Sequence, residues 1–122
     1  MQRLLKLLSV AAFATSLAAT SVFAHAFLDH AIPGVGMTVS GPVHELGIYF
    51  TQGVVTAFSH VHVVSAAGAQ IPVSKPVNDP SDQQIVIIRL GRALGTGIFS
   101  VSWQVVSVDT HTTQGTFTFT VS

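Results

Sequence analysis

The chain has 122 residues, enough for one domain, and only 8% of them are charged, well below the roughly 25% of an average soluble domain. The formal net charge is zero, so the chain has neither the basic surface that nucleic acid requires nor an acidic tail. Cysteine is absent, which excludes disulfides, thiolate metal sites and cysteine nucleophiles, whereas six histidines are a high number for this length.

The first segment has the pattern of a secretory signal peptide. A basic start precedes a largely apolar run over residues 7–19, and Val22 and Ala24 are small residues that fit a cleavage site. The alternative, a membrane anchor, is disfavoured because a membrane span needs about 20 apolar residues. We therefore predict that residues 1–24 are a signal peptide cleaved after Ala24, and that residues 25–122 form an exported domain, with the bacterial periplasm as the expected compartment.

The rest of the chain has the pattern of strands separated by turns. Residues 115–121 alternate between phenylalanine or valine on one face and threonine on the other, which is typical of a half-buried strand. Runs of β-branched and apolar residues predict further strands at 43–50, 58–65, 85–90 and 98–108. Glycine, proline and Asx residues mark turns between them, and the polar stretch 74–84 is expected to be a surface loop.

Several short strands in about 100 residues favour an all-β sandwich, with a small barrel as the alternative. The alternation places one set of large apolar side chains on a common face, and this set forms the predicted core: Phe99, Val101, Trp103, Val105, Phe117, Phe119 and Val121. Trp103 is expected to be a packing residue rather than a ligand-stacking surface.

Three residues from the two ends of the predicted mature chain suggest a metal site. Cleavage would make His25 N-terminal, so that its α-amine and its imidazole Nδ1 could chelate one ion. An α-amine pKa of about 7.7–8.0 allows a metal to displace the proton near neutral pH. Asp109 and His111 are two positions apart at the end of a long predicted strand, and residues i and i+2 of an extended chain share a face.

These donors are nitrogen and oxygen atoms, which in a tetragonal array favour Cu(II). Cu(I) prefers thiolate and thioether ligands, and Met37 is the only methionine after residue 24. The alternative is that Asp109 and His111 are ordinary surface residues.

The other histidines carry weaker signals. His60 and His62 share one face of a predicted strand and are expected to be exposed, with a weak second metal site or a proton-responsive patch as alternatives. His30, beside Asp29, is expected to be a polar loop residue rather than a neighbour of the metal. His44 is expected at the exposed start of a strand.

The mature chain resembles the CopC family of periplasmic copper-resistance and copper-handling proteins. Its start, His25-Ala26-Phe27-Leu28, is similar to the mature start of that family. Residues 99–111 (FSVSWQVVSVDTH) resemble the family pattern Tyr-x-Val-x-Trp-Arg-Val-Val-Ser-x-Asp-Gly-His, and residues 115–119 are similar to its closing Gly-x-Phe-x-Phe strand. The resemblance covers essentially residues 25–122.

This resemblance implies a Greek-key β-sandwich that binds Cu(II) through His25, Asp109 and His111. The methionine-rich segment through which many members bind Cu(I) is missing, so the resemblance implies a Cu(II)-only member. Gln104 and Thr110 stand where the family pattern has arginine and glycine, and neither position is a ligand in that pattern.

We expect a monomer that sequesters or carries one Cu(II) for copper resistance, homeostasis or import, and that is not an enzyme. The resemblance implies a CopD-like inner-membrane protein as partner, expected on a separate chain. One alternative is a copper monooxygenase with a histidine brace, against which Asp109 argues because it would fill the position that oxygen needs. The other is an interaction sandwich without metal.

Overall fold

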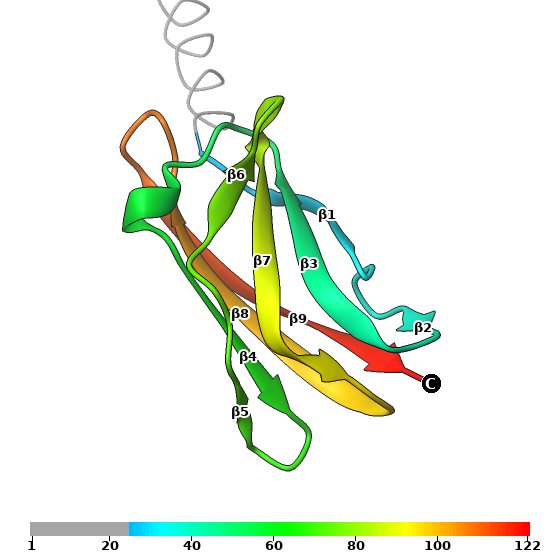
Figure 1. Cartoon of the computed structure of the whole chain (residues 1–122). Coiled ribbons are helices and arrows are strands. Elements are labelled where there is room, and N and C mark those ends of the chain that lie inside the picture. Colours follow the sequence, from blue (N-terminus) through cyan, green and yellow to red (C-terminus); the bar gives the residue numbers. More distant parts are fainter. Residues whose placement is uncertain (1–24) are drawn as a thin grey trace, which may run out of the picture.

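The computed structural model describes residues 25–122, so the predicted signal peptide lies outside the described residues. This part of the chain consists of nine strands and one short 3₁₀ turn, η1 at Thr56–Phe58. The strands form two sheets that face each other (Figure 1). Between residues 25 and 122 there is no helix of the length and apolar character that a membrane crossing needs.

The two sheets have four and five strands. The first has the order β1 (Leu28–Ile32), β3 (Val43–Phe50), β7 (Asp82–Leu94) and β6 (Val77–Asp79), all antiparallel. The second has the order β2 (Thr38–Val39), β9 (Thr112–Val121), β8 (Gly97–Val106), β4 (His60–Ser65) and β5 (Gln70–Ile71), in which only β2 and β9 are parallel. The chain crosses repeatedly between the sheets. The prediction of an all-β Greek-key sandwich is therefore confirmed, and the alternative of a small barrel is excluded.

The core lies between the sheets, where period-two alternation turns every second side chain inward. All seven predicted core residues of β8 and β9 are buried, Trp103 among them with 7% exposure. Trp103 pairs in register with Gly115, and the indole occupies the space beside it. A Cβ at Gly115 would lie 2.5 Å from Cζ2 of Trp103, so glycine at this position is required by packing.

The predicted strand at 58–65 starts two residues late, because the chain first makes the turn η1. Ser59 is buried behind this turn, where its hydroxyl donates to the carbonyl of Val55 (2.9 Å) and accepts from the amide of Val106 (3.1 Å). Phe58 is consequently 66% exposed instead of being part of the strand.

The prediction of a surface loop across 74–84 is wrong in part. Residues 77–79 form the edge strand β6, and β7 already begins at Asp82. The strand was missed because an edge strand needs no apolar face and reads as a polar run. The tight turn between the two strands is closed by Asp79, whose Oδ1 accepts hydrogen bonds from the amide (2.8 Å) and the hydroxyl (2.6 Å) of Ser81.

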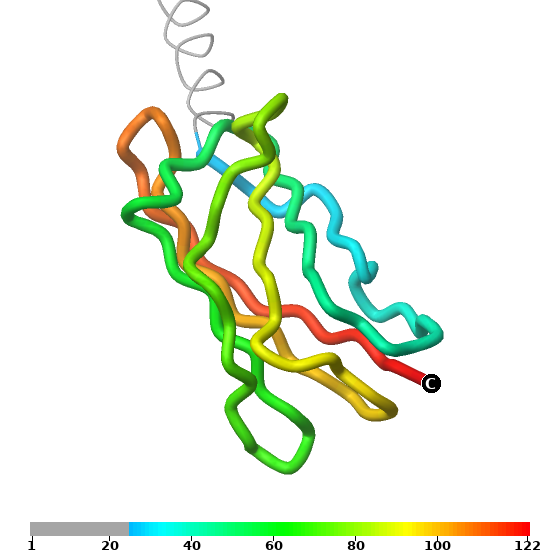
Figure 2. Tube along the Cα trace, viewed as in Figure 1, coloured from blue at the N-terminus to red at the C-terminus, as the bar shows by residue number. Residues whose placement is uncertain are grey.

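The start of the described chain and the loop between β8 and β9 lie at the same end of the sandwich. Figure 1 shows the blue first residues beside the orange loop, and the tube in Figure 2 follows both segments into the sheets. Residues from the two ends of the domain are therefore neighbours in space.

Candidate metal centre

Hydrogen bonds on both sides fix the backbone around His25. Ala26 is fully buried, and its carbonyl accepts a hydrogen bond from Oγ1 of Thr113 on β9 (2.6 Å). The Phe27 amide donates to Oγ1 of Thr51 (2.9 Å), and the Thr51 amide donates back to the carbonyl of Phe27 (2.8 Å). The same Thr51 hydroxyl reaches the carbonyl of His25 (3.3 Å). The sequence analysis assigned no role to Thr51 or Thr113, since isolated threonines carry no distinctive signal.

Asp109 and His111 lie in a turn after β8, not on a strand. The amide of Thr110 donates to the carbonyl of Ser107 (2.9 Å), and the amide of Ser107 donates to the carbonyl of His111 (2.9 Å). Thr110 sits at φ 72°, in the left-handed region. The prediction that strand alternation aligns Asp109 with His111 is therefore wrong, because the strand ends at Val106 and the turn itself brings the two side chains to one point.

The structure brings His25, Asp109 and His111 together. Nδ1 of His25 lies 3.9 Å from Oδ2 of Asp109, and Nδ1 of His111 lies 3.3 Å from the same oxygen. The two imidazole rings have centroids 4.2 Å apart, and each residue offers a ligand atom within 4.8 Å of the others. The side chains of His25 and Asp109 are partly buried, with 34% and 24% exposure, whereas that of His111 is 56% exposed.

The two oxygens of Asp109 have different surroundings. Oδ1 accepts a hydrogen bond from the buried hydroxyl of Ser107 and a longer one from the amide of His111 (3.4 Å). The hydrogen bond from Ser107 is the main cause that holds the pKa of Asp109 below its ordinary value. Oδ2 is left to face the two imidazoles. Ser107 belongs to the block that resembles the CopC family, but a serine two residues before an aspartate did not by itself indicate this role.

Two buried polar atoms of the centre lack a hydrogen-bond partner among the described residues. They are Nδ1 of His25 and Oδ2 of Asp109, which face each other over a distance too long for a hydrogen bond. A buried polar atom without a partner costs about 1–3 kcal/mol. A cation between them would satisfy both atoms.

The donor set fits a small divalent metal ion. Metal–nitrogen and metal–oxygen bonds of about 2 Å place neighbouring and opposite ligand atoms roughly 3–4 Å apart. The distances from Asp109 to His25 and His111 already fall in this range. Two imidazoles and a carboxylate, without sulfur, are donors that suit copper, nickel and zinc.

The remaining histidines stand apart from this centre. His30 lies on β1 rather than in a loop, where its Nδ1 is 2.7 Å from Oδ2 of Asp29 and its ring stacks on Tyr49 with centroids 4.1 Å apart. His44 is exposed near the start of β3, as predicted. The predicted exposure of the histidine pair on β4 is also confirmed.

A comparison with known protein families decides where the chain belongs. The family model described as "CopC domain" matches residues 28–122. The chain belongs to the CopC family. The predicted resemblance is therefore confirmed over almost the whole described structure.

Bacterial relatives are similar over nearly their whole length. Protein YobA of Escherichia coli K12 is 34% identical over 113 residues, which cover 93% of this CopC-family chain and 91% of YobA. Copper resistance protein C of Xanthomonas campestris pv. juglandis is 30% identical over 118 residues, which cover 93% and 92% of the two chains.

Solved structures have the same fold. CopC from Methylosinus trichosporium OB3b superposes with a TM-score of 0.74 at 23% identity, over 80% of this chain and 94% of that one. PcoC from Escherichia coli, described as a methionine-rich copper resistance protein, gives a TM-score of 0.72 at 22% identity, over 80% and 99%. These structural similarities show that the chain has the same β-sandwich fold as CopC and PcoC.

Proposed function

We propose that this CopC-family protein binds one Cu(II) as cargo through His25, Asp109 and His111, and that it sequesters or carries the ion. Membership of a family whose relatives are named copper resistance proteins supports a copper-related function. The observation that carries the finer proposal is the pair of buried, unpartnered atoms, Nδ1 of His25 and Oδ2 of Asp109, with the His111 imidazole beside them.

Each residue has a distinct task in this proposal. Once the chain begins at His25, the α-amine joins Nδ1 of the same residue in a chelate ring. Asp109 supplies an oxygen and a negative charge that offsets part of the charge of the ion. His111, the most exposed of the three, completes a tetragonal set from the solvent side.

The amine donor requires the proposed cleavage after Ala24, which in turn implies export to the periplasm. The absence of sulfur from the three ligands favours Cu(II) over Cu(I). Met37, the methionine between residues 25 and 122, is 58% exposed and lies beside β2.

We propose carriage rather than catalysis. A carboxylate aimed at the ion stabilises Cu(II) and fills the position that a copper monooxygenase would leave open for oxygen. An exposed ligand such as His111 suits exchange of the ion with a partner, for which a CopD-like membrane protein on a separate chain is the proposed candidate. The protein acts as a monomer in this scheme.

The test compares two forms of the exported domain, one that starts at His25 and one with a single glycine added before it. Both are titrated with Cu(II), and the copper is examined by EPR, after circular dichroism has shown equal folding. We expect one tight tetragonal ion in the native form and much weaker binding in the extended form. Equal binding would remove the amine from the ligand set, and no tight binding in either form would overturn the copper proposal.

A further inference from the structure

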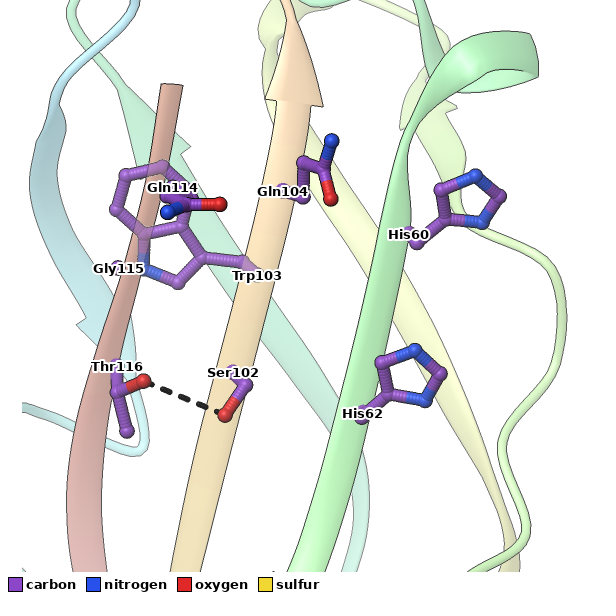
Figure 3. Close-up of a pocket in the computed structure, with 8 residues that line it drawn as sticks. All are labelled: His60, His62, Ser102, Trp103, Gln104, Gln114, Gly115 and Thr116. Carbon is purple, nitrogen blue, oxygen red and sulfur yellow. Dashed lines mark hydrogen bonds between the residues drawn. The ribbon is translucent and has the colours of Figure 1, made fainter. Parts of the chain in front are cut away.

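A second group of metal-binding side chains lies on the outer face of the five-stranded sheet. Val61 and Val63 of β4 are buried in the core, so the alternating His60 and His62 point away from it and are exposed. Figure 3 shows both imidazole rings projecting from the same side of β4, one above the other.

The register of the sheet surrounds this pair with uncharged polar groups. His60 lies opposite Gln104 and His62 opposite Ser102, in rows that continue to Gln114 and Thr116 of β9. An open hollow of about 450 Å³ lies over this part of the sheet, lined by His60, His62, Ser102, Trp103, Gln104, Gln114, Gly115 and Thr116. None of these residues carries a permanent positive charge, so nothing in the lining repels a cation.

The spacing allows both imidazoles to reach one ion. Residues i and i+2 of a strand are about 6.8 Å apart along the chain, and an imidazole binds a metal at about 2 Å. Small rotations of His60 and His62 toward each other would therefore bring one nitrogen of each to the same ion. Among the residues drawn in Figure 3, the hydrogen bond is between Ser102 and Thr116 (3.3 Å), so neither imidazole has to give up a hydrogen bond to another residue of the hollow.

We propose that His60 and His62 form a second, weaker site for a divalent transition-metal ion, with Cu(II) bound most tightly. Imidazole is a good ligand for copper, nickel and zinc, and copper stands highest in the order of divalent affinities. The site has two protein nitrogens and no carboxylate, and water or the Gln104 amide oxygen completes the coordination. With fewer ligands and no negative charge, it binds more weakly than a centre built on His25, Asp109 and His111.

This site lies on the sheet whose β8–β9 turn carries Asp109 and His111, but it does not depend on the first centre. Gln104, opposite His60, precedes Ser107 by three residues, or about 10 Å of extended chain. The two sites share no ligand, because one is built on β4 and the other on His25 and the turn between β8 and β9. The protein can therefore hold a second ion when copper is abundant, whether or not the first proposal is correct.

The experiment removes the first centre by substitution and measures the copper that the rest of the protein binds. The chain carrying His25→Ala, Asp109→Ala and His111→Ala is titrated with Cu(II) alone in a buffer that does not bind metal, and bound copper is measured by equilibrium dialysis and EPR. We expect one weakly bound ion. Adding His60→Gln or His62→Gln should lower its affinity at least tenfold, because a direct ligand matters at least as much as the surroundings of a ligand, which are worth about 10–100-fold.

His44→Gln is the matched control, since it removes an exposed strand histidine from the opposite sheet and should leave this ion unchanged. Zn(II) added during NMR should shift the ring signals of His60 and His62 together. If the triple variant does not fold, the glutamine substitutions are compared in the otherwise unaltered chain beyond one equivalent of copper. A weak ion that persists unchanged in His60→Gln and His62→Gln, or no ion once the first centre is removed, would overturn the second site. Failure of the first proposal appears separately, as unchanged tight binding after the Asp109 and His111 substitutions.

Discussion

The buried hydroxyl of Ser107 donates a hydrogen bond to Oδ1 of Asp109, and this contact determines which carboxylate oxygen faces the two imidazoles. The hydroxyl also reaches the carbonyl of His111 (3.1 Å), so it ties together the turn that carries two of the three proposed ligands. A ligand oriented in advance loses little freedom when an ion binds. Ser107 therefore orients the proposed ligand in the metal-free protein, which favours the binding of an ion.

Replacing the proposed carboxylate ligand should weaken copper binding strongly. Asp109→Asn keeps the shape of the side chain but removes its charge, and we expect the Cu(II) affinity to fall by at least about 10–100-fold. His111→Ala should have a similar effect. A competition titration against a chelator of known affinity measures both. Asp82→Asn, at the first residue of β7, is the control. Unchanged affinity in Asp109→Asn or His111→Ala would exclude that residue as a ligand.

Relieving the backbone at Thr110 should stabilise the protein. A β-branched residue at φ 72° is held in a region that costs about 1–2 kcal/mol. Thr110→Gly removes this cost but gives the unfolded chain more freedom, so we expect a net gain of about 0.5–1 kcal/mol in the free energy of unfolding. Urea denaturation without metal measures it. Thr112→Gly, in the neighbouring strand, should destabilise instead, and a loss at Thr110 would contradict the strain argument.

Filling the space beside the indole should destabilise the fold. Gly115→Ala places a methyl group 2.5 Å from Cζ2 of Trp103, and overpacking of a core typically costs about 1–3 kcal/mol. The single tryptophan allows a direct measurement by fluorescence. In Gly115→Ala its emission should differ from that of the native protein in the folded state, and the unfolding midpoint should be lower. Gly95→Ala, which meets no atom within 4 Å, should be close to neutral. Equal effects of the two substitutions would contradict the packing argument.

The turn at Asp79 should contribute to the pH dependence of stability. Hydrogen bonds from Ser81 are the main cause that lowers the pKa of Asp79 from its ordinary value of 3.8. A carboxyl group with a lowered folded pKa stabilises the protein above its ordinary pKa, and this contribution is lost as the pH falls through the folded pKa. The stability difference between the native protein and Ser81→Ala should therefore be larger near neutral pH than in strong acid.

Thermal denaturation over a series of pH values measures this difference. Asp79→Asn, which does not titrate, should remove at least as much of the pH dependence, because the Ser81 amide still donates to Asp79 in Ser81→Ala. The contribution of Asp109, whose pKa is also lowered, should remain in both variants. A stability difference that does not change with pH would show that the Ser81 hydroxyl acts without the charge of Asp79.

The sequence predicted the parts of this fold that local pattern determines. The strand β9 was predicted from its alternation, and β3 and β8 from their runs of β-branched and apolar residues. The two-residue strands β2 and β5 have no period to detect, and β6 is a polar edge strand. These short strands form because a neighbouring strand offers free hydrogen bonds, and this information is not local.

The candidate site was likewise predictable in part from the sequence. The spacing of Asp109 and His111 indicated that they would meet, but the cause is the turn at Thr110 rather than an extended strand. The approach of His25 depends on Thr51 and Thr113, which are distant in sequence and were not predictable from any motif.

The hydrogen bond from Thr113 to Ala26 joins residues 87 positions apart in a chain without cysteine. An ion shared between His25 and the Asp109 turn would add a second tie at the same place and close nearly the whole domain into a ring. An ion that binds only the folded chain stabilises it by mass action, by about 4 kcal/mol when the free ion concentration is about 1,000 times the Kd. The cargo would then serve as a removable cross-link, the task that disulfides perform in many exported domains of this size.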